Sequence, residues 1–268
     1  MPGEFAAPAA LRSDDRALAV ILSTEFLAII GATFLLAGFV KGFVGFGLPT
    51  VALALLTVTI GLKEAMALMV IPAILTNIWQ ASVGGSFQAV LRRLWPFIVM
   101  MFLGAWVGGG ILVRSDQIII SGVLGVLLLI YSAVSLITPQ VPTPGRREIW
   151  MAPVVGGITG VVTGLTGTFV MPGALYLQAL ALPRDVFVQA MGIMFGMASV
   201  ALAVSLSGHG LLTMETGGIS AAGIVPALVG MAAGRWARQR LSDRLFRQFF
   251  FSALIVLGVY LVGRALLQ

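Results

Sequence analysis

Cysteine is absent from this chain of 268 residues, and the only histidine is His209. A chain without cysteine cannot form disulfides, iron–sulfur clusters or thiolate metal sites. One histidine by itself supplies neither a zinc site nor a pair of haem ligands. These absences exclude a secreted scaffold held together by disulfides, and we expect the protein to use no cofactor and no metal.

Charged side chains are also scarce. The 16 basic and 10 acidic side chains make up 10% of the residues, whereas a soluble domain has about 25%. Hydrophobic residues make up 59%, and the mean hydropathy is +1.06. So few charges cannot cover a core of this size in water. A soluble enzyme and a nucleic-acid-binding domain are therefore excluded as descriptions of the whole chain.

Long runs without charge identify the class of protein. Most of them exceed the roughly 20 residues that a membrane-spanning helix needs. They also lack the alternation at every second residue that membrane β-strands show. The stretches without Asp, Glu, Lys or Arg cover residues 42–62, 65–91, 94–113, 117–145, 149–183 and 216–234. We therefore predict an all-α polytopic membrane protein that is embedded in the lipid bilayer.

The chain is duplicated. The pattern G-x-x-x-G-x-x-G occurs at 38–45 and again at 160–167, followed in each copy by a proline, Pro49 or Pro172. Further matching residues follow in the same order in both halves. We predict four parts: a polar N-terminal tail over 1–16, a first transmembrane repeat over 17–137, a linker over 138–149 and a second repeat over 150–268.

Each half contains one segment that is too short to cross the membrane. Helical segments are predicted at 18–40, 49–61, 65–84, 94–112, 117–137, 150–163, 172–182, 186–207, 216–235 and 246–266. The segments at 49–61 and 172–182 cannot comfortably cross about 30 Å of hydrocarbon. Each follows a glycine-rich break. We therefore expect about 8–10 membrane segments, with discontinuous or re-entrant helices.

The distribution of basic residues indicates how the halves lie in the membrane. If the first two segments of each half form a hairpin, ten basic residues lie on one side. The five on the other side are Arg12, Arg16, Lys63, Arg114 and Arg264. By the positive-inside rule, both termini are then periplasmic and the second half is inverted relative to the first. Inverted repeats with broken helices are the architecture of secondary transporters.

The two breaks are the predicted binding region. Irregular backbone survives inside a membrane only where it lines a cavity or is buried in protein. Helices that start after Pro49 and Pro172 would direct free N–H groups at an anion near the membrane midplane. Lys41, inside the first break, would offset the charge of the anion. The alternatives are that the glycines allow close helix packing and that Lys41 reaches to the interface.

Polar side chains near the breaks complete the predicted site. Asn77 and Gln80 share one helix face, as substrate ligands or as interhelical hydrogen-bonding groups. Trp79 would wall the cavity, and the second copy carries hydroxyls where the first carries Lys41. The predicted substrate-binding residues are Lys41, Gly42, Gly45, Gly47, Asn77, Trp79, Gln80, Thr163, Gly164, Thr166, Gly167 and Thr168.

These motifs make the chain similar to a known family. The two glycine-rich stretches, 38–49 and 160–172, resemble those of the sulfite exporter TauE/SafE family of bacterial membrane permeases, and the resemblance covers about residues 26–266. It implies export of a small sulfur-containing anion, such as sulfite or an organosulfonate like sulfoacetate, across the cell inner membrane. The second copy departs from the first at Thr168.

We therefore predict a secondary transporter that exports such an anion by alternating access, not an enzyme. A proton or sodium ion could couple the transport, and a homodimer is an open alternative to a monomer. Uptake of a small organic or inorganic anion is the alternative function. An intramembrane enzyme would need paired carboxylates or a nucleophile beside a base. A cation channel would need a ring of acidic residues, whereas the intramembrane charge here is positive.

Overall fold

The computed structural model describes residues 24–137, 142–169, 171–240 and 242–267, so the predicted tail over 1–16 and part of the predicted linker lie outside the described residues. Within this part the chain is helical and contains no strand, which confirms the predicted all-α class. The first half contains α2 (Thr24–Val44), α3 (Leu48–Ile60), α4 (Leu62–Ser82), α5 (Phe87–Arg114) and α6 (Gln117–Ile137). A short 3-10 turn, η1 (Gly145–Arg147), leads into the second half. That half contains α7 (Glu148–Thr166), α8 (Gly173–Ala179), α9 (Arg184–Gly208), α10 (Met214–Ala222), α11 (Ile224–Arg238) and α12 (Asp243–Leu267).

The described residues include eight spans that are long and apolar enough to cross a membrane. This number agrees with the predicted range of membrane segments. One of these spans, Met214–Arg238, combines α10 and α11, and the short helices outside the eight spans are α3, with 13 residues, and α8, with 7. At 1.5 Å per residue neither reaches across about 30 Å of hydrocarbon. Both short helices follow a break, as the sequence predicts.

One predicted helix is two helices. The segment expected over 216–235 is divided at Gly223 into α10 and α11. Pro226 explains the division, because it has no N–H to donate to the carbonyl of Ala222 one turn earlier. A side chain at Gly223 would press into the ring of Phe34, within 2.6 Å of its nearest carbon. The division therefore lies where Phe34 of α2 packs against Gly223.

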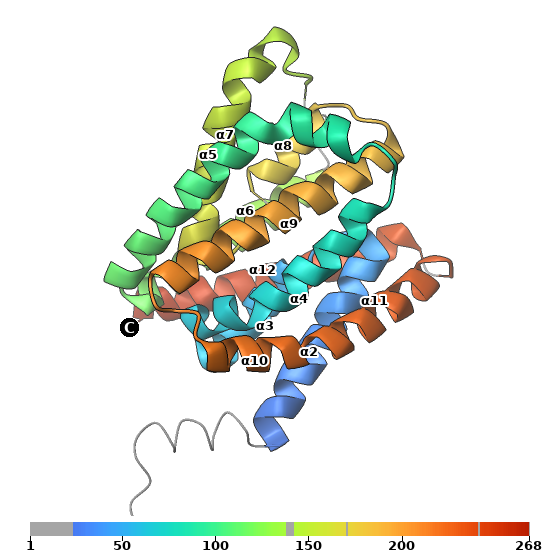
Figure 1. Ribbon diagram of the computed structural model, residues 1–268. Helices are drawn as coiled ribbons and strands as arrows, with labels where there is room; N and C mark the ends of the chain where they lie inside the picture. The colour runs from blue at the N-terminus through green and yellow to red at the C-terminus, as the bar shows by residue number, and fades with distance from the viewer. Residues whose placement is uncertain (1–23, 138–141, 170, 241, 268) are drawn as a thin grey trace, which may run out of the picture.

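The two halves are joined by close helix contacts. In Figure 1, α2 lies against α11, and α5 lies against α7. A side-chain carbon at Gly38 would overlap the carbonyl oxygen of Ala227, and one at Gly160 would overlap that of Met101. Glycine therefore lets the backbones touch, as small residues do in membrane helix pairs. The first helix of each half packs in this way against a later helix of the other half.

Among the helices long enough to span a membrane, the most buried are α4 and α9, which lie side by side across the middle of the molecule (Figure 1). In each, 61% of the most apolar stretch is buried inside the protein, against 28% for α12. The core therefore lies along α4 and α9, while α12 presents most of its surface outward. Any polar side chain that α4 or α9 directs inward must find its partners within the protein.

Candidate functional site

The first break begins after α2, not within it. The helix continues through Lys41 to Val44, and the Gly45 N–H donates to the Lys41 carbonyl at 2.8 Å. Residues 45–47 leave the helix, and Gly45 and Gly47 have φ values of +93° and +107° that favour glycine. The expectation that Lys41 lies inside the break is therefore wrong, because Gly42 fits in the helix, where it packs against α11.

Lys41 lies in the last turn of α2 and is 4% exposed. Among the residues whose burial is described, it is the one charged side chain that is buried. Its ammonium group donates to the Thr76 hydroxyl at 3.1 Å and to the Asn77 side-chain oxygen, both on α4. Lys41 is therefore held inside the protein by two neutral oxygens and does not reach to the membrane interface.

Asn77 extends this polar contact to α9. Its amide lies 3.5 Å from the Ser199 hydroxyl, at the limit of a hydrogen bond, and Ser199 donates to the Phe195 carbonyl at 2.7 Å. Lys41, Thr76, Asn77 and Ser199, here called the Lys41 cluster, thus join α2, α4 and α9. All four side chains are buried. Three of the four residues lie on α4 and α9, the helices along which the core lies, and Lys41 reaches them from α2.

The Lys41 cluster contains a positive charge and no negative one. In the described part of the chain, Lys41 takes part in no salt bridge, and the other members of the cluster are neutral. A cation within a membrane protein normally has a partner or a functional role. An ammonium group has three protons to donate, and the hydrogen bonds to Thr76 and Asn77 use two of them. The third proton can therefore be donated to an oxygen of an anion.

The second break is neutral. Here α7 continues to Thr166, and Gly167, with φ +74°, closes the helix by donating to the Thr163 carbonyl at 2.8 Å. The Thr163 hydroxyl donates to the Thr159 carbonyl at 2.7 Å, and the Thr166 hydroxyl to the Val162 carbonyl at 2.8 Å. These hydroxyl protons are used by the backbone of α7 itself.

Lys41 and the second break contact α4 at different places. A side-chain carbon on Gly167 would come within 2.8 Å of Met66 and 3.0 Å of Leu53, so the second break packs against α3 and α4. Lys41 contacts α4 at Thr76, ten residues after Met66. Ten residues correspond to about 15 Å of helix. The structure therefore does not bring Thr163, Thr166 and Thr168 into hydrogen-bonding contact with Lys41.

The sequence comparisons identify the family. The model of the family described as sulfite exporter TauE/SafE matches residues 30–261, nearly the whole chain. The chain belongs to the sulfite exporter TauE/SafE family. No curated protein and no solved structure matched it. As a TauE/SafE protein with eight apolar spans, it is a multi-pass membrane protein of a transporter family.

In this TauE/SafE protein, Gln80 connects helices. It donates to the Val188 carbonyl at 3.1 Å, and Gln189 donates back to the Ala81 carbonyl at 2.8 Å. These two amides fasten α4 to α9, which favours the interhelical interpretation of Gln80. Trp79 is 53% exposed, with Arg235 over its ring at 5.7 Å. The structure therefore does not place Trp79 among the buried side chains of the Lys41 cluster.

The predicted glycines of this TauE/SafE protein divide into two groups. A side chain at Gly42 would overlap the carbonyl oxygen of Met231, and one at Gly164 that of Ala105. Close packing, the alternative that the sequence left open, accounts for these two. Gly45, Gly47 and Gly167 instead have positive φ values and end their helices.

Sequence reasoning missed Ser199. The duplication of the chain could have indicated this residue, because Asn77 and Ser199 are 122 residues apart. The first glycines of the two breaks, Gly38 and Gly160, differ by the same number, since 160 minus 38 is 122. Ser199 is therefore the residue that corresponds to Asn77 in the second half. A comparison of the two halves position by position could have found it.

Proposed function

We propose that the protein is a secondary transporter that exports a small sulfur-containing anion, such as sulfite or an organosulfonate like sulfoacetate, across the bacterial inner membrane. Its family consists of membrane permeases for sulfur-containing anions, which supports the substrate class. The observation that carries the proposal is the buried, uncompensated charge of Lys41. A bound anion supplies the negative charge that the Lys41 cluster lacks.

The anion binds at the first break, beside Lys41. Thr76 and Asn77 hold the ammonium group in place, and its third proton is left to donate to the anion. The hydroxyls of Thr163 and Thr166 in the second break contribute no proton to this site, because they donate to α7. Their oxygens can still accept, which fits an accompanying sodium ion better than an anion.

Transport follows from movement of one half against the other. The exchange of packing between α2 and α11 and between α7 and α5 supports two repeats related by inversion. Both repeats carry a broken helix, and α4 and α9 meet between them. Rocking about this contact exposes the Lys41 cluster to each side of the membrane in turn. The distribution of basic residues supports periplasmic termini.

The test is equilibrium binding of sulfite, sulfoacetate, taurine and sulfate to the purified protein in detergent. Lys41→Ala should weaken binding of the preferred anion by at least about ten-fold, because it removes the one positive charge that is buried among the residues whose burial is described. Lys63→Ala is the matched control, since Lys63 is the other lysine of the chain and lies at the start of α4. It should bind normally.

Folding must be separated from binding in this test. Gel filtration shows whether each variant is folded. If Lys41→Ala does not elute as a single folded peak, Lys41→Met replaces it in the test, because methionine has a similar length and no charge. Equal saturable binding by the wild type and a folded Lys41 variant would overturn the proposed site. Absence of binding of every sulfur anion to the wild type would overturn the proposed substrate class.

A further inference from the structure

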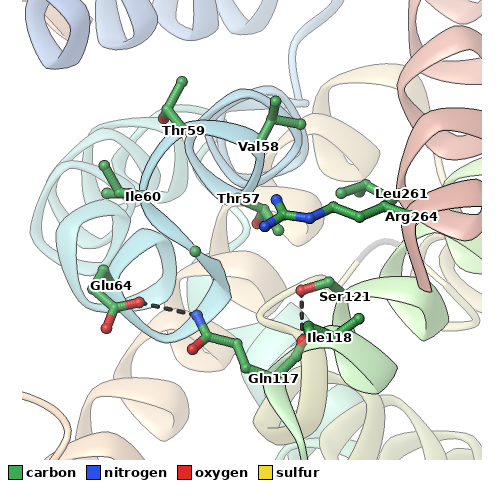
Figure 2. A pocket seen from close by; sticks show the side chains of 11 residues that line it. Thr57, Val58, Thr59, Ile60, Glu64, Gln117, Ile118, Ser121, Leu261 and Arg264 are labelled. Carbon is green, nitrogen blue, oxygen red and sulfur yellow. Dashed lines mark hydrogen bonds between the residues drawn. The ribbon is translucent and has the colours of Figure 1, made fainter. Parts of the chain in front are cut away.

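A polar pocket lies at the end of α3 that is remote from the Lys41 cluster. Its volume is about 360 Å³, and its walls come from α3, α4, α6 and α12. Figure 2 shows its side chains converging from these helices. Because α12 belongs to the second half, both halves of the chain form the pocket. None of its lining residues belongs to the predicted binding site.

Two groups in the pocket have unused hydrogen-bond donors. Arg264, on α12, points across the pocket toward α3 (Figure 2), and within the described residues it forms no ion pair. Thr57, on α3, is 2% exposed, and its hydroxyl has no hydrogen-bond partner. A buried hydroxyl without a partner is unfavourable. The described residues offer no acceptor for the Thr57 hydroxyl, so a bound ligand could supply one.

The other hydroxyls of the pocket are already used. Thr59 donates to the Leu56 carbonyl at 3.1 Å, and Ser121 donates to the Gln117 carbonyl at 2.7 Å. Both bonds lie within the helix that carries the hydroxyl. Thr57 therefore differs from Thr59 and Ser121 in keeping its proton available. Together with the guanidinium of Arg264, it offers donors to one small acceptor.

The pocket also contains a carboxylate. Glu64, in the first turn of α4, accepts from the Gln117 amide at 3.0 Å. In Figure 2 this pair lies on the side of the pocket away from Arg264. Glu64 repels an anion and Arg264 attracts it, so substitutions at the two residues should have opposite effects on anion binding.

We propose that this pocket binds a small oxyanion between Arg264 and Thr57 and is the site from which the transported anion leaves the protein. The identity of the anion rests on the proposed function. A guanidinium group presents several donors to the oxygens of an oxyanion, and the hydroxyl adds one from the opposite wall. The opposing charge of Glu64 weakens the binding, which favours release.

The short helix α3 connects the two sites. It begins at the break that follows Lys41 and ends at the pocket, a distance of about 20 Å for 13 residues. Thr50 and Thr57 are seven residues apart and therefore share one face of α3. Both hydroxyls are buried and without a partner. An anion that leaves the Lys41 cluster along this face meets these hydroxyls before it reaches Arg264.

The experiment measures binding of sulfite to the purified protein in a nanodisc of phosphatidylcholine, which has no net charge. Arg264→Gln should weaken binding to the pocket by about ten-fold, and Arg264→Lys should restore part of it. Glu64→Gln should strengthen it. Thr57→Val removes only the hydroxyl and should weaken binding without loss of thermal stability. Arg114→Gln is the matched control, because Arg114 is an arginine at the end of α5 outside the pocket.

The outcomes separate this proposal from the proposed function. In the background of Lys41→Ala, the remaining sulfite binding should still depend on Arg264. Normal binding in Arg264→Gln and Thr57→Val, with a loss in Lys41→Ala, would overturn the pocket and leave the proposed function intact. Weaker binding in Glu64→Gln would also overturn the pocket as an anion site.

A lipid phosphate group has the same oxyanion chemistry as the transported anion. A second nanodisc that contains phosphatidylglycerol distinguishes the two sources. If the pocket serves the transported anion, the effect of Arg264→Gln on sulfite binding persists in both membranes. If Arg264→Gln instead changes only the retention of phosphatidylglycerol, the pocket holds a lipid and the proposal is overturned.

Discussion

Lys41 owes its importance to its surroundings more than to its type. The chain contains two lysines, and Lys63 lies near the end of a helix while Lys41 is buried against α4. Thr76 and Asn77 hold Lys41 through oxygens that carry no full charge. A cation held in this way can attract an anion, whereas one paired with a carboxylate cannot.

This distinction predicts the effect of Asn77→Asp. The new carboxylate would replace the amide oxygen that accepts from Lys41 and would neutralise the cluster. We expect anion affinity to fall by at least about ten-fold while the protein remains folded. Isothermal titration with the preferred anion measures the change.

Asn77→Ser is the control for this substitution, because it is polar, small and neutral. It should keep the affinity within a few-fold of the wild-type value. If Asn77→Asp bound the anion as tightly as the wild type, the charge of Lys41 would have no part in binding.

At the scale of the helix, the same glycine-rich motif has two functions. Gly38 and Gly42 remain helical and let α2 touch α11, whereas Gly45 and Gly47 end the helix with positive φ. In the second half, Gly160 and Gly164 pack against α5, and Gly167 ends α7. One motif therefore joins the halves and also produces the break.

The packing function predicts different effects of alanine at two positions of α2. A methyl group at Gly42 would overlap the Met231 carbonyl, so Gly42→Ala should destabilise the protein by about 1–3 kcal/mol. Gly31 has no atom within 4 Å of the corresponding position. Gly31→Ala should therefore be neutral or stabilise by up to about 1 kcal/mol. Thermal unfolding in detergent compares the two variants, and equal stability would contradict the close contact.

At the scale of the whole molecule, the two proposed anion sites lie at opposite ends of α3. The Lys41 cluster lies at the start of α3 and the pocket of Arg264 at its end. The ends of α5 and α12 carry Arg114 and Arg264, and the positive-inside rule assigns these arginines to the periplasm. In the mechanism that we propose, export toward this side leads from Lys41 along α3 to the pocket.

The orientation predicts the labelling of single cysteines, which is convenient because the chain has none. In intact cells, a membrane-impermeant maleimide should react with Arg114→Cys and Arg264→Cys. It should react with Arg92→Cys and Arg184→Cys only after the membrane is permeabilised. Arg92 belongs to the first half and Arg184 to the second, so the pair also tests the inversion. Labelling of all four variants in intact cells would contradict the proposed topology.

Much of the architecture can be predicted from the sequence because a membrane imposes simple rules. The scarcity of charge and the length of the apolar runs indicate helices that cross the bilayer. The duplicated motif predicts the two breaks, and the structure places α3 and α8 after them. The exact ends of α2 and α7 could not be predicted, because G-x-x-x-G permits both a helix and a break.

The contacts across the molecule were decided by tertiary structure. The charge pattern already indicates an intramembrane Lys41, since its neighbours in the sequence are apolar. Only the tertiary structure, which brings the Lys41 side chain to α4 and packs α4 against α9, shows that its partners are Thr76 and Asn77 and that Ser199 lies beyond them. The pocket at the end of α3 likewise needs α12, about 200 residues later in the chain, to bring Arg264 to Thr57. Local rules determine helices because their hydrogen bonds are local, whereas a site depends on which distant helices pack together.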